Sequence, residues 1–353
     1  MATTSQRSST AVTSFPALVA CMTLGTFSLA VAYFTLPPLL TLLLLPLPVL
    51  LTYAVARAAV GLPPTIMGVE GKAPAVPRGQ QRYQLVAMPI NHFGEKLRWC
   101  MDLLAVDYEE SNVGGILSIF ARGRTVPWLV DRLSCSLIGN SDEALCYLSA
   151  VHVPSMQGEA AQKGVALLRR SAGTMAWEER LNALGHAIQG WAYYYLLARN
   201  ADPDITLRYW GAKEPTVPWM HRLALQLGYP LFKGLMRKAF TLHDESARQK
   251  RYDTIVAVLD DADAALEQSG AKHLTGESIS YVDISFCALV GPLLPSTIIP
   301  LWANGRFASF APLQDHPSMP TELTDFEQAL RRRPCGQYVE RMFRQWRNRS
   351  FGV

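Results

Sequence analysis

One long stretch near the N-terminus carries no charged side chain. Between Arg7 and Arg57 there is no Asp, Glu, Lys or Arg, and residues 15–60 are almost entirely apolar. A membrane crossing by a helix needs about 20 apolar residues, and this stretch is more than twice that long. A single crossing would leave many of these residues in water. The stretch therefore argues against an ordinary enzyme that is soluble over its whole length.

Two adjacent prolines divide the apolar stretch. Pro37 and Pro38 lie near its middle, where fixed φ angles and missing amide donors interrupt a helix. Spans at 16–36 and 39–57 would each have about the length of one crossing. The pattern predicts that residues 1–60 form a membrane anchor, and it leaves open whether there are one or two transmembrane helices.

Basic residues on both sides of the stretch predict its orientation. Arg7 precedes the stretch, and Arg57, Lys72 and Arg78 follow it. A helical hairpin would place both flanks on the cytosolic side, because positive charge is retained there. We therefore expect a membrane protein whose soluble domains face the cytosol. The acid-poor, Ser/Thr-rich start leaves organelle targeting as an alternative, whereas a secretory signal would be shorter.

The remaining charge is unevenly distributed. Charged residues make up 18% of the chain, against about 25% in soluble domains, and the net charge is +4. Residues 329–353 contain seven Arg and one Glu, which gives +6 and leaves −2 elsewhere. Because the basic residues lie in a short tail rather than over a folded face, we expect no nucleic-acid partner. The last helix is expected to be solvated, or to lie against anionic lipid headgroups.

The soluble part begins after a linker and has two different halves. Residues 61–81 are rich in Pro and Gly and have no periodic apolar pattern. From 82 to about 150 the order is β-α-β-α-β-β-α, which predicts a mixed sheet with helices on its faces. Beyond Ser155 only helical patterns remain. The expected elements are strands at 83–88, 106–110, 128–130 and 135–138, and helices at 93–104, about 113–121, 141–150, 174–199 and 246–269.

Three sequence blocks carry a resemblance to a known family. They read NHFGEKLRWCMDLLAVDYEE, RTVPWLVD and IGNSDEALCYL, and their order and spacing resemble the N-terminal domain of the glutathione transferase superfamily. The tail, LRRRPCGQYVERMFRQWRNRS, resembles the ending of a largely uncharacterised group of bacterial and eukaryotic transferase-like proteins. The resemblance implies an α/β thioredoxin-like domain at 82–153 and an all-α glutathione-transferase-type domain at 154–353, with the transmembrane hairpin ahead of both. It also implies glutathione as co-substrate and a possible homodimer.

The resemblance also assigns roles to residues that would hold glutathione. In such domains the proline of Thr125-Val126-Pro127 is cis, an arrangement that proline reaches cheaply. Val126 would then pair with the cysteinyl part of glutathione as an added strand would. Ser141 opens a helix, and in the family this position receives the γ-glutamyl carboxylate. The alternative for Ser141 is a plain N-cap without a ligand.

The sequence departs from the family at two positions. Relatives place Ser, Tyr or Cys where this chain has Asn91, whose amide would donate to the glutathione sulfur beside a helix N-terminus. Both sulfurs of a Cys-x-x-Cys are missing between Asn91 and Gly94, so we expect no disulfide exchange. Asn140 stands where an acidic residue is common, so it offers no charge to the glutathione amino group. His92 is either a general base or a solvated turn residue.

The helical half offers a candidate wall for the second substrate. His186, Gln189, Tyr193 and Tyr194 lie about one helical turn apart, and the resemblance places this helix beside the electrophile. The alternative is a buried packing stripe, which aromatic residues at helical spacing commonly form.

Other conspicuous residues are expected to be structural. Ser280 and Asp283 form a Ser-x-x-Asp capping box. Asp260, Asp261 and Asp263 are expected on a solvated helix face, because no Gly-containing loop accompanies them. Six scattered Cys lack partners at zinc spacing, so no metal is expected.

Two functions remain at this stage. The first is a transferase that adds the glutathione thiolate to a hydrophobic electrophile near a membrane, with Asn91 as its catalytic residue. The second is a non-catalytic membrane adaptor or ligand-binding protein that retains the fold. The loss of the hydroxyl, thiol and acid at the expected positions favours this second function.

Overall fold

The computed structural model describes residues 76, 79–115, 117, 126–268, 270, 272–313 and 315–351. Ala73–Leu117 and Val126–Val353 belong to one compact unit. The predicted anchor at 1–60 and most of the linker lie outside the described residues. The predicted boundary between the two soluble domains also stays a prediction.

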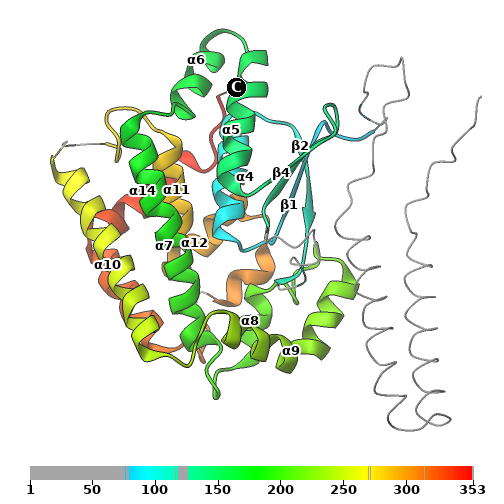
Figure 1. Cartoon of the computed structure of the whole chain (residues 1–353), viewed down its shortest axis with the longest axis vertical. Helices are drawn as coiled ribbons and strands as arrows, with labels where there is room; N and C mark the ends of the chain where they lie inside the picture. Colours follow the sequence, from blue (N-terminus) through cyan, green and yellow to red (C-terminus); the bar gives the residue numbers. More distant parts are fainter. Residues whose placement is uncertain are drawn as a thin grey trace, which may run out of the picture. The chain divides into compact units, whose positions relative to one another are not determined.

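A four-stranded mixed sheet forms the first half of the described chain (Figure 1). Its order is β2-β1-β3-β4, with β1 and β2 parallel and the other two pairs antiparallel. The mixed sheet predicted from the sequence is confirmed. The strands are β1 (Tyr83–Ala87), β2 (Tyr108–Asn112), β3 (Trp128–Asp131) and β4 (Ser136–Gly139).

Two helices are interleaved with these strands and pack against each other. Helix α4 (His92–Leu103) follows β1, and α5 (Ser141–Val151) follows β4. Both begin at asparagines whose side chains cap the first turn, Asn91 and Asn140. The helix predicted at about 113–121 lies largely outside the described residues.

After Ser155 the described residues form helices and no further strand, as predicted from the sequence. The elements are η2 (Val153–Ser155), α6 (Gly158–Leu167), α7 (Ala172–Leu196), α8 (Pro203–Tyr209), α9 (Trp219–Ala239), α10 (Glu245–Gln268), α11 (Tyr281–Val290), η3 (Gly291–Leu293), α12 (Pro295–Ile298), η4 (Ile299–Gly305), η5 (Ala308–Leu313), α13 (Thr321–Arg332) and α14 (Pro334–Trp346).

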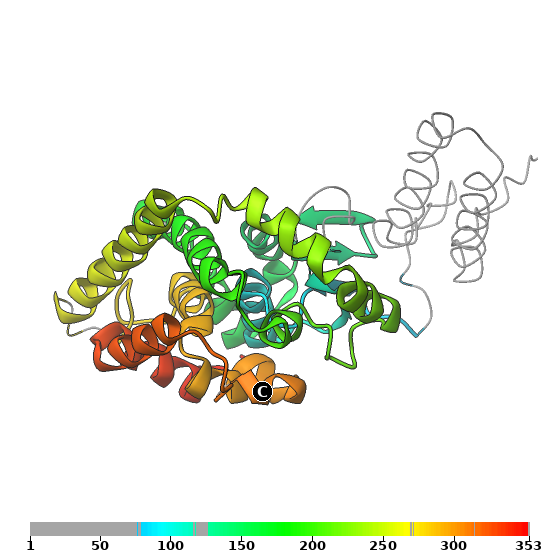
Figure 2. The same ribbon diagram turned by 90° about the horizontal axis from the view of Figure 1, so that it is seen from below.

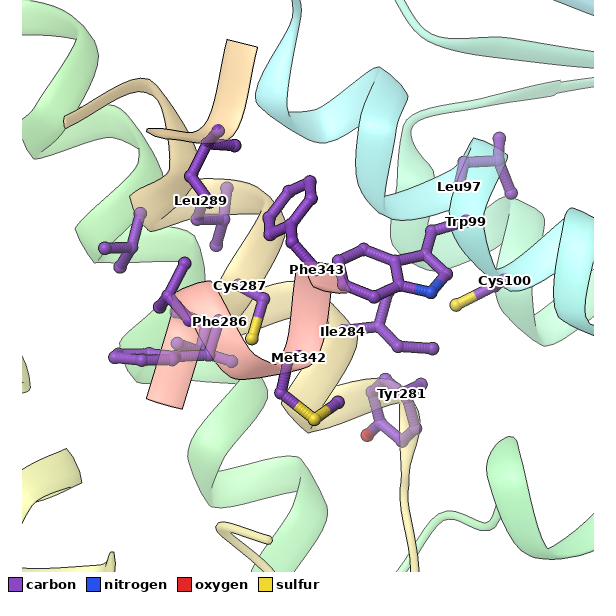
Figure 3. Packing of buried hydrophobic residues seen from close by; sticks show 14 of the residues in the cluster. Leu97, Trp99, Cys100, Tyr281, Ile284, Phe286, Cys287, Leu289, Met342 and Phe343 are labelled. Carbon is purple, nitrogen blue, oxygen red and sulfur yellow. The ribbon is translucent and has the colours of Figure 1, made fainter. Parts of the chain in front are cut away.

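Helix α11 is the centre of the hydrophobic core. All of its residues are buried, as expected for a helix that is apolar on every side. It packs against α4 and α7. Helix α14 also packs on this core, where Phe343 of α14 contacts Trp99 of α4 with ring centroids 4.7 Å apart (Figure 3). Ser280 and Asp283 form the predicted capping box, and Asp283 also accepts a hydrogen bond from Tyr338 at 2.6 Å.

Among the described residues no single helix is long and apolar enough to cross a membrane. One bent pair of segments, Tyr281–Leu293 and Pro295–Gly305, meets the length and composition requirement only when the two are taken together.

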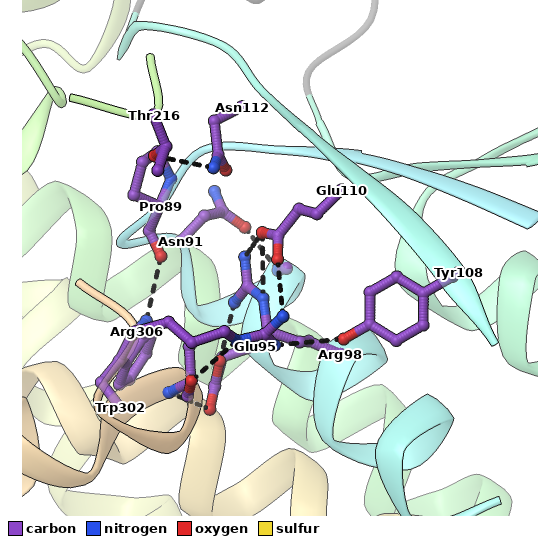
Figure 4. A network of polar contacts seen from close by, with 12 residues as sticks. Pro89, Asn91, Glu95, Arg98, Tyr108, Glu110, Asn112, Thr216, Trp302 and Arg306 are labelled. Carbon is purple, nitrogen blue, oxygen red and sulfur yellow. Dashed lines mark hydrogen bonds and ion pairs between the residues drawn. The ribbon is translucent and has the colours of Figure 1, made fainter. Parts of the chain in front are cut away.

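A buried ion-pair network ties α4 to the C-terminal segment. Glu95, Arg98 and Arg347 have fully buried side chains. Glu95 accepts hydrogen bonds from Arg98 at 2.7 Å and from Arg347 at 2.6 Å, and Arg347 also reaches Asp102 at 2.7 Å. Burial alone would raise the pKa of Glu95, but the charges of Arg347 and Arg98 outweigh it and hold that pKa below its usual value. Figure 4 shows Glu95 and Arg98 with their neighbours.

The prediction of a solvated basic tail is wrong for two of its arginines. Arg347 is fully buried, and Arg333 donates to Asp263 at 2.8 Å and also pairs with Asp260. The expectation of a solvated acidic face on α10 is confirmed for Asp260 and Asp261, whose side chains are 63% and 49% exposed, and is corrected for Asp263, which also accepts from the Cys335 amide at 2.7 Å. The tail therefore contacts α4 and α10 through ion pairs as well as through the buried apolar face of α14.

Replacing Arg347 with Met removes the charge that faces Glu95 and keeps much of the side-chain volume. We expect the free energy of unfolding to fall by about 3–5 kcal/mol, because a buried carboxylate loses a partner. Arg344→Met, in the last turn of α14 just before Arg347, is the control, since Arg344 is 63% exposed, and it should change stability by less than about 0.5 kcal/mol. Chemical denaturation measures both, and equal effects would contradict the role given to Arg347.

Candidate functional site

The ends of three strands meet at one edge of the sheet. Val86 of β1 is opposite Trp128 of β3, and Trp128 is opposite Gly139 of β4. The C-terminal ends of β1 and β4 therefore lie beside the N-terminal end of β3. Helices α4 and α5 both begin at this edge, so their free backbone amides and positive dipole ends are close to each other.

The Val126–Pro127 peptide bond is cis, as the resemblance implied. It lies directly before β3, at the edge where the three strand ends meet. The Pro127 carbonyl accepts a hydrogen bond from the Asn140 amide at 3.1 Å, which joins this turn to the start of α5. Val126 is buried, and among the described residues no hydrogen-bond partner is found for its backbone groups.

Asn91 caps α4 and is half-buried at the same edge (Figure 4). Its side-chain oxygen accepts a hydrogen bond from the Gly94 amide at 2.6 Å. Because the oxygen is used in this cap, the side-chain amide nitrogen is the group left to donate to a ligand. Gly94 permits the tight turn, since a Cβ there would lie 3.2 Å from the Ala87 Cβ.

The N-cap of α5 is Asn140 and not Ser141, which the sequence had offered as a cap without a ligand. It has a positive φ of 61°, and its side-chain oxygen accepts from the Glu143 amide at 2.9 Å. Asparagine tolerates this backbone conformation better than most residues. Ser141 is the first residue of α5 and is buried, and within the described chain its hydroxyl has no hydrogen-bond partner.

A buried lysine, which the sequence analysis missed, fixes the two helix starts to each other. Lys96 of α4 is almost fully buried and forms an ion pair with Asp142, the second residue of α5. Asp142 also accepts from Asn182 of α7 at 2.8 Å. Burial would raise the pKa of Asp142, but the Lys96 charge and the hydrogen bonds from Lys96 and Asn182 together lower it. Lys96 lies among the apolar positions of α4, the one sequence signal of its burial.

An apolar pocket opens beside Asn91, with a volume of about 90 Å³. The start of α4 forms one side of it, and α7, α8, α12 and α13 form the others. Asn91 and His92 contribute polar groups from the sheet domain, so the pocket and the sheet edge share residues. The lining residues are Met88, Ile90, Asn91, His92, Ile188, Gln189, Ala192, Tyr193, Leu196, Tyr209, Pro292, Leu293, Pro295, Met319, Leu323, Thr324 and Glu327.

The expectation of a solvated His92 is wrong. The side chain lies in the first turn of α4 and is only 8% exposed, and its Nε2 has no hydrogen-bond partner within the described part of the chain. Burial, together with the nearby His186, lowers the pKa of His92 to about 3. His92 therefore faces the pocket as a neutral ring at physiological pH, which makes it a poor general base.

The structure separates the four residues proposed for the electrophile wall. Gln189 and Tyr193 line the pocket, and the Tyr193 hydroxyl accepts a hydrogen bond from the Trp210 indole at 3.1 Å. His186 is exposed and packs on Phe93 with ring centroids 5.4 Å apart. Tyr194 donates to Glu245 at 2.7 Å, away from the pocket lining.

Glu327 is a further polar group in the pocket wall that the sequence analysis did not identify. It is 7% exposed, and its carboxylate accepts a hydrogen bond from the Ser296 amide at 2.9 Å. Burial raises the pKa of Glu327. The available signal was its position between Leu323 and Leu330 on the apolar face of α13. Among the described residues, no cluster of His, Cys, Asp and Glu side chains is suited to a metal ion.

Solved structures similar to this chain include several glutathione transferases. An enzyme of Ceriporiopsis subvermispora in complex with glutathione is 14% identical, with a TM-score of 0.45, over 75% of this chain and 97% of that one. A glutathione transferase of Methylobacillus flagellatus with glutathione bound is 15% identical, with a TM-score of 0.36, over 73% and 98%. A Pseudomonas fluorescens family member with two glutathione bound is 14% identical, with a TM-score of 0.38, over 76% and 95%.

No protein-family profile matches the sequence, and a search of curated proteins finds no match. Identities and TM-scores at the level of these structures do not show that the chain belongs to the transferase superfamily. The geometry of the sheet edge and of the adjoining pocket therefore carries the functional proposal.

The buried, neutral His92 predicts a specific pH dependence of stability. Above about pH 6.5 the ring is neutral in both states; below it the unfolded chain binds a proton that the folded chain excludes, down to about pH 3. Between neutral pH and pH 5, the free energy of unfolding of wild type should thus fall by about 2 kcal/mol more than that of His92→Gln, which has no such proton to bind. Denaturation at the two pH values measures this difference. Identical pH profiles for the two proteins would show that His92 is not held neutral.

Proposed function

We propose that this chain is a glutathione transferase attached to a membrane. The observation that carries the proposal is the convergence of Asn91, the cis Val126–Pro127 turn and Ser141 at one edge of the sheet, next to an apolar pocket. A tripeptide thiol needs backbone pairing, an anion site and a thiol position, and this edge supplies a candidate for each. The glutathione bound to several similar structures supports the same ligand here.

Each group would have one role in binding. Val126 would pair through its backbone with the cysteinyl residue, and Pro127 holds that backbone in place. The Ser141 hydroxyl and the first amides of α5 would bind the γ-glutamyl carboxylate, because a helix N-terminus attracts anions. Asn140 would lie close to the ammonium group without offering it a charge.

The sulfur would then lie at the start of α4. There the Asn91 amide nitrogen can donate to the thiolate, and the positive end of the helix lowers the pKa of the thiol. The thiolate forms a bond to an electrophilic carbon, and either a leaving group departs with the bonding electrons or the adjacent carbon takes up a proton. Because Asn91 also lines the pocket, the electrophile would approach the sulfur from an apolar chamber walled by Gln189 and Tyr193.

One observation favours the non-catalytic alternative. The Asn91 oxygen is already used as a helix cap, so Asn91 has a structural reason to be present even without chemistry. An adaptor that kept the fold would retain this cap and bind glutathione weakly or not at all. The activity of Asn91 variants therefore decides between the two functions.

The uncharged N-terminal segment supports the membrane attachment. Residues 1–60 would form one or two transmembrane helices, with the folded part facing the cytosol. A hydrophobic electrophile dissolved in the bilayer would then be concentrated near the pocket.

A homodimer is also proposed on the basis of the family resemblance.

Asn91→Asp separates catalysis from capping. The carboxylate keeps the cap acceptor but removes the amide donor and places a negative charge beside the thiolate. We expect kcat/KM to fall by about tenfold or more, which corresponds to at least about 1.4 kcal/mol of lost transition-state stabilisation. Asn91→Ser, which keeps the cap and offers a hydroxyl donor, should retain activity.

Conjugation of glutathione to a panel of activated aryl halides and unsaturated carbonyl compounds measures these rates. Thermal unfolding of the same samples checks that both variants remain folded. A wild-type protein that conjugates none of the panel, or variants that all react alike, would contradict the catalytic proposal and favour the adaptor.

Asn140→Asp should strengthen glutathione binding. The change keeps the cap oxygen and adds a charge near the expected position of the ammonium group, so we expect Kd to fall by about three- to tenfold. Asn200→Asp, at an exposed site elsewhere, is the control for added negative charge and should leave Kd unchanged. Unchanged or weaker binding in Asn140→Asp would place the ammonium group elsewhere.

A further inference from the structure

Helix α9 exposes its apolar side chains in a row. Five large residues at four-residue intervals point away from the core, and Leu227 and Leu231 are 75% and 64% exposed. A surface helix of a globular protein normally turns this face inward. We call the row the α9 apolar face; it consists of Trp219, Leu223, Leu227, Leu231 and Leu235.

The inward side of α9 is narrow. Only Leu225 and Tyr229 of this helix are buried. At about 100° per residue, the exposed positions from Trp219 to Lys238 cover about half of the helix circumference. An arc of that width suits a plane better than it suits one partner helix, which contacts a narrower stripe. Figure 1 places α9 at the lower edge of the compact unit, next to α8, and Figure 2 views the unit from that side.

The charges of α9 all have one sign. The helix contains Arg222, Lys233, Arg237 and Lys238 and no acidic residue. Lys233 and Arg237 donate to carbonyls at the end of α7, at 2.6 Å each, and so hold α9 in place. Lys238 is exposed beside the last apolar position. A tryptophan at one end and a basic residue at the other are suited to the boundary between headgroups and acyl chains.

We propose that α9 lies in the plane of a lipid bilayer, with the α9 apolar face inserted among the acyl chains and the exposed Lys238 near anionic headgroups. The inference rests on the proposed membrane attachment, because the uncharged stretch that ends at Ala56 would keep the compact unit, which begins near Ala73, within reach of the bilayer.

This placement brings the pocket close to the lipid. Trp210 follows α8 and contacts both α9 and the pocket wall. Its ring centroid is 5.9 Å from that of Tyr229 in α9, and its indole donates a hydrogen bond to the pocket residue Tyr193. Tyr209, the last residue of α8, also lines the pocket. One buried side chain, Trp210, therefore separates α9 from the pocket wall.

Trp219 is a natural probe of this placement. The sequence has eight Trp, all of them in the described residues, and Trp219 is exposed to 56%. Trp346 is half-buried. The other six are buried: Trp99, Trp128, Trp177, Trp191, Trp210 and Trp302.

The experiment uses the full chain, reconstituted with vesicles that contain anionic lipid and acyl chains carrying bromine, a quencher of Trp fluorescence. Flotation first shows whether the chain is bound to the vesicles. In the floated fraction we expect bromine to quench the emission of wild type more than that of Trp219→Phe. Iodide in the water should quench the two proteins equally, because lipid shields Trp219.

The control moves the probe to another helix. Val165 on α6 is 59% exposed, and Figure 1 shows α6 at the opposite end of the compact unit from α9. The double variant Trp219→Phe/Val165→Trp should show no additional quenching by bromine compared with Trp219→Phe. Equal quenching at positions 165 and 219 would overturn the placement of α9.

The remaining outcomes separate this inference from the proposed attachment. A chain that does not float overturns both. A chain that floats, but whose bromine quenching is the same with and without Trp219, overturns the α9 inference and leaves the N-terminal anchor standing. In that case quenching of Trp219 by iodide identifies a solvated face, and protection from iodide identifies a second copy or the N-terminal segment as the cover.

Discussion

The buried carboxylate of Glu95 joins parts of the chain that are 252 positions apart. Its partners are Arg98 in its own helix, the Ala303 amide, and Arg347 just after the last helix. A buried charge that loses a partner is strongly destabilising, so the docked C-terminal segment stabilises α4 in its observed position. Because Asn91 caps α4, the geometry at the candidate thiol position depends on the far end of the sequence.

The local elements could be predicted from the sequence because their signals are local. An apolar run predicted β1, helical spacing predicted α4, α7 and α10, and Ser280 with Asp283 predicted the start of α11. The partners of charged residues could not be predicted, since Arg347 looks like any tail arginine until its contact with Glu95 is seen. The burial of His92 depends on helices that pack from the second half of the chain, and no pattern around this residue records it.

The site combines a polar edge with an apolar chamber. The edge is built from two helix starts and a cis-proline turn, all held by backbone and capping hydrogen bonds. The chamber adds the neutral His92 and a buried carboxylate, Glu327, but no basic side chain lines its described wall. Such a chamber suits an uncharged electrophile, and it leaves activation of the thiol to the dipole of α4 and to the Asn91 amide. The family resemblance pointed to Gln189 and Tyr193, but the same helical spacing also included His186 and Tyr194, which do not line the pocket, and Tyr209 and Glu327 were not predicted.

Calorimetric titration of the full chain with glutathione tests the central claim most directly, because it does not depend on knowing the electrophile. The account predicts one saturable site per chain, with Kd at least about tenfold weaker in Ser141→Ala, a loss of about 1.4 kcal/mol. Ser149→Ala, in the same helix, should bind like wild type. A folded protein that shows no saturable heat up to about 10 mM glutathione, or a Ser141→Ala variant that binds like wild type, would contradict the account.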